Sequence, residues 1–428
     1  MLKRFATTVV VLAVVGGSAL SDAKMGGVAR QISMGGVGGA GIALNPFIFE
    51  DPAYQYINPA YQGLYKDYGW ANIGGNGGSV TGLTTGANGY GMQHGGMNFS
   101  LGEGIAIGTV LAYDPSALNI LMGAMANPLL GGAGYVSGPP IMAPPAAEVL
   151  EVVGSYGWDH SHFGLGVMYG WTSQDMTTTA GKSELTGSVI GFRAGIHQDL
   201  GSGNAWEASA TFRSNSADDK SPTVSGSGSL TEFGVSGRAK LRVNNKVNFV
   251  PIAAFATASG DVTYPTPSVP SDISVTALAV GVGAELNYSS LYLAGGFSYA
   301  MAKNEVTIAP TTASNTVTSF PTFNVGGEWW FTDWLAGRAG YFRAFTNFKT
   351  ETPGGTTTET NFFSGTSFVG VGGYGDNNLI VLGLAARWGD FSLETTVSEE
   401  ALRRGFGLAG GSDDINSFGY MTAGWNWQ

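Results

Sequence analysis

The sequence has no cysteine and little charge. Only 12% of its 428 residues are charged, whereas a soluble domain normally carries about 25%. The lack of cysteine excludes a disulfide framework and a thiolate metal site, but it does not fix the compartment. The net charge of −11 argues against nucleic acid as a partner.

Long apolar runs are also missing beyond the N-terminus. A membrane-spanning helix needs a run of about 18 or more apolar residues, and none follows the first 23 residues. The chain has instead 68 glycines and 43% apolar residues. Low charge, abundant glycine and no spanning helix together predict a transmembrane β-barrel.

The first 23 residues predict a secretory signal peptide. Lys3 and Arg4 form its basic end, and residues 5–15 form its apolar core. The segment 21–23 is a cleavage site of the small-x-small type, with cleavage after Ala19 as the alternative. A membrane anchor helix is disfavoured because the apolar core is short and glycines end it.

Alternation of apolar and polar residues dominates the chain from Leu64 onward. In the segment 233–243, apolar residues occupy one face, and polar and basic residues such as Arg238 and Lys240 occupy the other. Strict alternation predicts strands with one apolar and one polar face. The strands are predicted to be about 10–16 residues long, against about 5–6 in soluble sheets. Tryptophans also fall at strand ends, as in aromatic girdles; they are Trp70, Trp158, Trp171, Trp206, Trp329, Trp388, Trp425 and Trp427.

The connections give the strand count, because seven tight turns alternate with eight longer polar segments. We therefore predict an all-β fold, a transmembrane antiparallel β-barrel of about 16 strands over residues 63–428, with 14 as the alternative. The last strand must pair with the first, since an open sheet edge cannot face lipid. We expect a bacterial outer-membrane location with the long connections extracellular. These connections are 75–86, 114–147, 175–184, 216–226, 263–272, 308–315, 351–376 and 399–415.

Residues 24–62 predict an N-terminal plug inside the lumen. They are rich in glycine, which favours neither helix nor strand. A barrel of about 14–16 strands is wide enough to hold an aqueous channel unless something fills it. Inward-facing charges of both signs predict a structural network that holds the strands and the plug; they are Arg193, His197, Glu207, Arg213, Glu232, Arg238, Lys240, Arg242, Arg338, Arg387 and Glu394.

The connection 114–147 is unusually apolar for an extracellular loop. It predicts a helix of about three turns, capped by Asp114 or Ser116. One interpretation is a landing site for a hydrophobic ligand, and the other is a constriction that folds into the barrel. The candidate ligand contacts are Ile120, Leu121, Met125, Leu129 and Leu130.

Motifs for catalysis or cofactor binding fail on context. Residues 36–41 match the dinucleotide pattern G-x-G-x-x-G, but no strand-turn-helix unit surrounds them. The four histidines show no ligand spacing beyond the pair His160 and His162, and nothing places a Ser/His/Asp set together. We predict no enzymatic activity, no cofactor and no metal site.

The N-terminal segment resembles the superfamily of FadL-type outer-membrane transporters of hydrophobic compounds and the related PorV-type proteins. The resembling residues are Ala29-Arg30-Gln31, Met34-Gly35-Gly36, Ala40-Gly41-Ile42-Ala43, Asp51-Pro52 and Asn58-Pro59-Ala60. The resemblance implies a plugged barrel, commonly with fourteen strands, which differs from the count of sixteen. It also implies an exit through a gap in the barrel wall at a kink in the third strand, for which Gly104 and Gly108 are the candidates.

Two functions follow from these expectations. The first is passive uptake of hydrophobic small molecules, such as long-chain fatty acids or hydrocarbons, through a channel gated by the plug. The second is a PorV-like, non-transporting barrel that acts as scaffold or shuttle in protein secretion or surface attachment. The expected partners are outer-membrane lipid, a hydrophobic ligand and, in the second case, envelope or secretion proteins. A general aqueous porin is a weaker third reading, because it would not need a plug.

Overall fold

The computed structural model describes residues 26–35, 51–56, 58–74, 94–112, 148–178, 181–220, 225–263, 270–308, 311–352, 355, 357–362, 378–397 and 418–427. The predicted signal peptide, Gly36 and the whole connection 114–147 with its five candidate ligand contacts lie outside these residues. They stay predictions.

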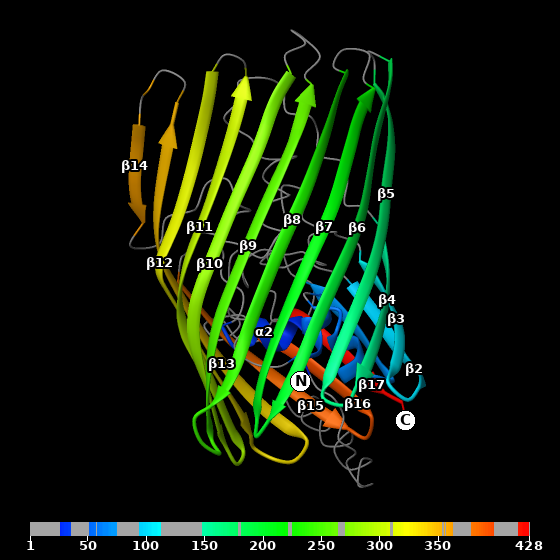
Figure 1. Cartoon of the computed structure of the whole chain (residues 1–428), viewed down its shortest axis with the longest axis vertical. Helices are drawn as coiled ribbons and strands as arrows, with labels where there is room; N and C mark the ends of the chain where they lie inside the picture. Colours follow the sequence, from blue (N-terminus) through cyan, green and yellow to red (C-terminus); the bar gives the residue numbers. More distant parts are fainter. Residues whose placement is uncertain are drawn as a thin grey trace, which may run out of the picture.

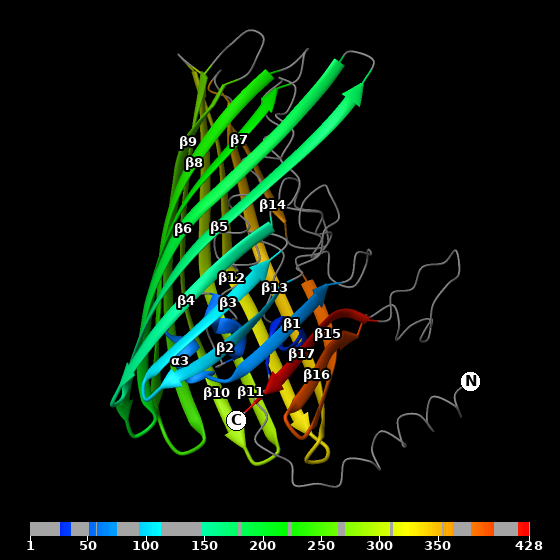
Figure 2. The same cartoon turned by 90° about the vertical axis from the view of Figure 1, so that its right-hand side faces the viewer.

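The described strands form one closed antiparallel sheet (Figures 1 and 2). The first strand, β1, pairs with β2 on one side and with the last strand, β17, on the other, which closes the barrel. β14 and β15 both pair with the same side of β13, so the two together fill one wall position. The wall therefore has sixteen positions, which confirms the predicted count. The strands are β1 (Tyr68–Gly74), β2 (His94–Gly102), β3 (Ile105–Ala112), β4 (Glu148–Trp158), β5 (Ser161–Thr178), β6 (Gly181–Gly201), β7 (Asn204–Lys220), β8 (Ser225–Arg242), β9 (Val247–Thr263), β10 (Pro270–Tyr288), β11 (Leu291–Ile308), β12 (Thr311–Trp330), β13 (Leu335–Glu351), β14 (Thr357–Phe362), β15 (Asn378–Trp388), β16 (Phe391–Val397) and β17 (Phe418–Asn426).

The wall is much taller over β5 to β13 than elsewhere (Figure 2). Strand β6 has 21 residues, whereas β1 and β16 have 7 each. The predicted connections 175–184, 216–226 and 308–315 are therefore wrong over most of their length, and β14 lies inside the predicted connection 351–376. The reason is visible in β5, where the outward residues are apolar up to Trp171 and then become Ser173, Asp175 and Thr177, all exposed. A strand whose outer face turns polar above the membrane looks like a polar loop in the sequence.

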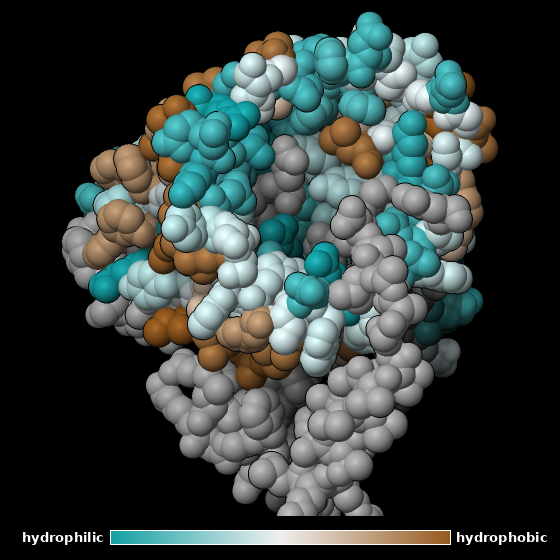
Figure 3. All heavy atoms as spheres, turned by 90° about the horizontal axis from the view of Figure 1, so that it is seen from below, coloured by the Kyte–Doolittle hydropathy of each residue, from teal (hydrophilic) through white to brown (hydrophobic). Residues whose placement is uncertain are grey.

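The outer surface carries a belt of exposed apolar side chains. On β5, for example, Phe163, Leu165, Val167 and Tyr169 all point outward and are exposed. Figure 3 shows the barrel from below, the end at which β4 is joined to β5 and β8 to β9. In this view apolar residues lie on the flanks of the ring, and hydrophilic residues lie around its central hollow. An apolar outer band on a closed sheet is what a lipid bilayer requires. The protein is thus a transmembrane β-barrel of the bacterial outer membrane.

Six of the eight predicted girdle tryptophans are exposed: Trp158, Trp171, Trp206, Trp329, Trp388 and Trp425. Trp70 is not, since only 7% of it is exposed and it lies on the lumen face of β1 with its ring stacked on Tyr68. The prediction for Trp70 was therefore wrong, because the lumen face of β1 is covered.

Three short helices lie inside the barrel (Figure 1). They are α2 (Val28–Ser33), the 3-10 helix η2 (Pro52–Tyr56) and α3 (Tyr61–Leu64). We call the described residues 26–35, 51–56 and 58–65 the plug. These described residues lie in the lumen, where the fold prediction placed an N-terminal plug. The predicted bounds 24–62 stay a prediction. No helix in the described part of the chain is long and apolar enough to cross a membrane.

Candidate functional site

The first half of the plug rests on two facing glycines of the wall. Gly326 of β12 and Gly340 of β13 are directly paired, and both lie on the lumen face. A Cβ atom would lie 2.7 Å from the carbonyl carbon of Met34 if added at Gly326, and 2.5 Å from the same atom if added at Gly340. Gly35 adopts a φ of 76°, which other residues rarely adopt. Met34 and Gly35 therefore fit only where the wall has no side chains.

The second half of the plug rests on a matching pair. Gly164 of β5 and Gly195 of β6 are also directly paired. A Cβ at Gly164 would lie 2.5 Å from the backbone nitrogen of Ala60, and a Cβ at Gly195 would lie 2.9 Å from the side chain of Pro59. Asn58 Nδ2 donates to the carbonyl of Ile196 at 3.1 Å, and its Oδ1 accepts from Ala60 N at 3.0 Å. The Asn58-Pro59-Ala60 motif is thus a docking element.

These two glycine pairs were missed in the sequence. The available signal was a glycine at a lumen-facing position of a strand whose residues alternate between apolar and polar. Recognising a pair also requires the register between the two neighbouring strands. We refer to Gly326 with Gly340, and Gly164 with Gly195, as the two glycine sockets.

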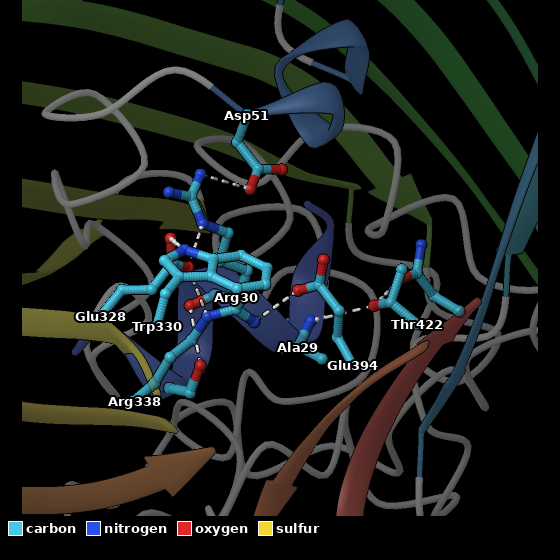
Figure 4. Close-up of polar contacts among 10 residues, drawn as sticks. Ala29, Arg30, Asp51, Glu328, Trp330, Arg338, Glu394 and Thr422 are labelled. Carbon is cyan, nitrogen blue, oxygen red and sulfur yellow. Dashed lines mark hydrogen bonds and ion pairs between the residues drawn. The ribbon is translucent and has the colours of Figure 1, made fainter. Parts of the chain in front are cut away.

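A buried network of charges ties α2 to the wall (Figure 4). Arg30 binds Glu328 of β12 at 3.0 Å and Asp51 of the plug at 3.4 Å. Arg338 of β13 binds Glu328 at 2.6 Å and Glu394 of β16 at 2.5 Å. Arg30 and Asp51, which were predicted only as motif residues, therefore link the two halves of the plug to three wall strands.

Smaller polar contacts complete this side of the plug. Trp330 Nε1 donates to Glu328 Oε1 at 3.3 Å. The backbone nitrogen of Ala29 donates to Thr422 Oγ1 of β17 at 3.1 Å (Figure 4). The first residues of α2 are thereby fixed to the strand that closes the barrel.

The other end of the plug is held by Arg193 of β6. Its guanidinium binds both oxygens of Glu151, at 2.7 Å and 2.5 Å, and donates to the carbonyl of Gln55 at 3.0 Å. Asn98 of β2 adds side-chain hydrogen bonds to Gln55 and Gln62. All of these side chains are at most 2% exposed.

Arg238 of β8 forms a third anchor. It pairs with Glu207 at 2.6 Å, donates to the hydroxyl of Tyr61 at 2.5 Å, and lies 4.2 Å from the ring centre of Tyr54. These contacts agree with the predicted structural role of the lumen charges. The ion pairs of Arg193 and Arg238 join wall strands to each other, and the same two guanidinium groups donate hydrogen bonds to the plug. Removing one partner of such a buried pair typically costs about 3–5 kcal/mol.

One sector of the lumen wall is apolar instead. The inward side chains of β9 and β10 above the level of Val250 are aliphatic, and each is at most 7% exposed. We call this set the apolar stripe; it consists of Val250, Ile252, Ala254, Ala256, Ala258, Ile273, Val275, Ala277 and Ala279. At its lower end it packs against Tyr54 and Tyr61 of the plug. Alternation alone did not reveal the stripe, since both faces of these strands are largely apolar.

The third strand has one irregularity, and it lies at the start of the strand. Residues 105–112 of β3 pair with β4 without a register shift, and residues 106–112 pair with β2 in one register, but the register toward β2 shifts at Ile105, which pairs with Gly102. Gly104 lies in the preceding turn with a φ of 78°, and Gly108 lies where Gln62 of the plug closely approaches the wall. The lateral opening at this strand stays a prediction.

His162 and His197 are brought together by the fold, although 35 positions separate them in the sequence. They face each other across β5 and β6 with ring centres 6.3 Å apart. Within the described residues, no group of three or more His, Asp or Glu side chains is arranged to hold a metal ion.

No protein family matches the chain, and no curated protein sequence matches it. Among solved structures, it is similar to the toluene transporter TodX of Pseudomonas putida, with 11% identity and a TM-score of 0.38 over 95% of this chain and 97% of that one. It is similar to FauA, the alcaligin outer-membrane receptor of Bordetella pertussis, with 9% identity and a TM-score of 0.41 over 84% and 75%. It is also similar to BauA, the ferric preacinetobactin receptor of Acinetobacter baumannii, with 9% identity and a TM-score of 0.42. That likeness covers 77% of this chain and 53% of the receptor. At such low values these likenesses carry no argument about activity.

Proposed function

We propose that the protein is an outer-membrane channel for passive uptake of hydrophobic small molecules, such as long-chain fatty acids or hydrocarbons, with the plug as its gate. The observation that carries the proposal is the apolar stripe. The lumen of a water-filled barrel is normally polar. A continuous aliphatic surface inside the lumen suits a molecule that water solvates poorly.

The stripe is long enough to guide such a molecule. From Val250 to Ala258 it covers eight residue steps of β9, which is about 27 Å along the strand. The side chains of the stripe are at most 7% exposed, so a ligand beside them takes the place of other atoms rather than of water. Aliphatic side chains have no hydrogen bonds to lose in that exchange.

A charge inserted into the stripe tests this proposal. Ala256→Asp places a carboxylate at a lumen position of β9 that is 6% exposed. Ser259→Asp is the matched control, since Ser259 lies on the same strand but is exposed on its outer face. We expect Ala256→Asp to weaken the binding of radiolabelled hexadecane by the detergent-solubilised protein and Ser259→Asp to leave it unchanged. Equal binding by both variants would remove the support that the stripe gives.

A non-transporting scaffold or shuttle for protein secretion or surface attachment is the second candidate. The observation that favours it is the set of buried ion pairs that fix the plug, because a barrel without traffic has no need of a mobile plug. Gentle extraction followed by mass spectrometry separates the two functions. Stoichiometric envelope or secretion proteins without bound apolar molecules would favour the scaffold.

A further inference from the structure

The plug is held on several sides by polar contacts and on one side by apolar contacts. Among the described residues, its hydrogen bonds reach Asn98 of β2, Ile196 of β6, Arg238 of β8, Glu328 of β12 and Thr422 of β17. At the lower end of the apolar stripe it meets side chains of β9, β10 and β11 that contain only carbon and hydrogen. We call this contact the plug seam; it comprises Tyr54, Tyr61, Leu64 and Tyr65 of the plug and Val250, Ile252, Ala254, Ala279 and Ala300 of the wall.

We propose that an apolar ligand passes the plug through the plug seam, while α2, the charge network and both glycine sockets stay in place. The inference rests on the proposed transport function and specifies where transport occurs. It also removes the conflict between a firmly anchored plug and an open passage, because the anchored side does not have to move.

The chemistry of the contacts selects this side. A ligand that enters the plug seam replaces the apolar contacts between the tyrosine rings and the aliphatic wall by other apolar contacts. Of the hydrogen bonds between plug and wall named above, the one from Arg238 to the hydroxyl of Tyr61 ends on a residue of the plug seam. Opening the plug at α2 would separate Arg30 from Glu328, and opening it at Asn58 would leave the carbonyl of Ile196 unbonded. Buried polar groups that lose their partners are strongly disfavoured.

The plug seam is continuous with the apolar stripe. Val250, Ile252, Ala254 and Ala279 belong to both. In the strand ladder Ala254 is paired with Ala279, and Ala256 with Ala277 directly above. A ligand that moves down the stripe therefore reaches the plug without leaving the aliphatic wall.

The same residues define the ligand class. No wall side chain of the plug seam can donate or accept a hydrogen bond or carry a counter-charge. Arg238, which faces Ile252 in the ladder, is engaged by Glu207 and by the hydroxyl of Tyr61. Of the two ligand types named above, the plug seam fits an uncharged hydrocarbon and disfavours a carboxylate, which would lose its hydration there.

Two variants separate the seam from the anchored side. Ala279→Phe fills the plug seam, and Val280→Phe is its matched control, because Val280 is the next residue and points outward with 42% exposure. The anchored side is locked by a disulfide between Ala29→Cys and Thr422→Cys. In the native protein the backbone nitrogen of Ala29 lies 3.1 Å from the hydroxyl oxygen of Thr422. The native chain has no cysteine, so an oxidised pair is unambiguous, and the reduced form of the same protein is the control.

The readout is uptake of radiolabelled hexadecane by Gram-negative cells that express each variant, compared with cells lacking the protein. The phenylalanine ring of Ala279→Phe would occupy the plug seam that the ligand has to enter, so we expect this variant to lose most of the uptake. Val280→Phe and the oxidised anchor lock should retain uptake, and excess palmitate should not compete. Heat-modifiable migration on gels verifies that each barrel has folded. If Ala279→Phe does not fold, Ala254→Leu takes its place.

The two levels of the proposal fail differently. If the unmodified protein gives no uptake above cells without it, the transport function fails. If the unmodified protein transports hexadecane but the oxidised anchor lock stops it, or the filled seam does not reduce it, then the ligand passes elsewhere and the inference is overturned.

Discussion

Filling one glycine socket should release the plug without unfolding the wall. In Gly164→Ala the new Cβ would lie 2.5 Å from the backbone nitrogen of Ala60, whereas ordinary contact begins at 3.4 Å. The Asn58-Pro59-Ala60 motif must therefore move by at least 0.9 Å, the difference between these two values. Because the obstacle is backbone, no rotamer change can relieve it.

The cost of that movement can be estimated. Overpacking of a filled contact costs about 1–3 kcal/mol. The hydrogen bond from Asn58 Nδ2 to Ile196, now 3.1 Å long, would be stretched or lost at about 0.5–1.5 kcal/mol. Together these costs are about 1.5–4.5 kcal/mol, and a value near the lower end, about 2 kcal/mol, corresponds to about a 30-fold shift in the opening equilibrium of the plug.

Hydrogen exchange measured by mass spectrometry on the detergent-solubilised protein reports this opening directly. We expect peptides covering residues 51–65 to exchange about 30-fold faster in Gly164→Ala, and peptides from β7 to β10 to remain protected. Gly154→Ala is the control, because Gly154 lies on the outer face of β4 and an added Cβ there meets nothing within 4 Å. Unchanged exchange at 51–65, or equal acceleration in both variants, would refute the socket argument.

Three further predictions follow from burial and charge. Arg338→Met leaves Glu394 buried without its guanidinium partner and leaves Glu328 paired with Arg30 alone, so the folded barrel should melt at a clearly lower temperature, with a loss of about 3–5 kcal/mol. Lys303→Met, which breaks an exposed pair with Glu305, should cost at most about 1 kcal/mol. Similar gel-shift temperatures for the two variants would contradict this. Trp70→Ala should destabilise the folded barrel by about 3–5 kcal/mol, because it is a buried large-to-small change. Measured by urea unfolding of the barrel in lipid vesicles, this loss should exceed that of Trp171→Ala. The reverse order would contradict the lumen position of Trp70. Deleting residues 120–130 should abolish binding of long-chain alkyl ligands while the barrel still assembles, and unchanged binding in detergent would exclude these residues as the landing site.

The barrel, its sixteen wall positions and most of the inward charges were predictable from the sequence because they depend on local alternation. Arg242 is an exception, since it is exposed and donates to the turn residues Ser202 and Asn245. An outward arginine would be costly in lipid, so the polar face could be assigned to the lumen before the pairing was known. The height of the wall was not predictable. Alternation continues beyond the membrane with a polar outer face, as at Ser173 and Asp175, and polarity there indicated loops.

The interior of the barrel could be predicted only in outline. The sequence indicated that residues 24–62 enter the lumen, but the sockets depend on register between separate strands, such as Gly326 with Gly340. The charge partners are distant as well, since Arg30 binds Glu328 across 298 positions. The apolar stripe escaped notice because a strand that is apolar on both faces shows no alternation.

The central claim, that apolar molecules travel along the stripe of β9 and β10, has one most direct test. Crystals of the protein soaked with a brominated long-chain alkane would locate bromine by its anomalous scattering. We expect bromine peaks inside the lumen, beside Ala256 and Ala277 and at the plug seam. Bromine found solely among the detergent on the outer belt, with none along the stripe, would contradict it.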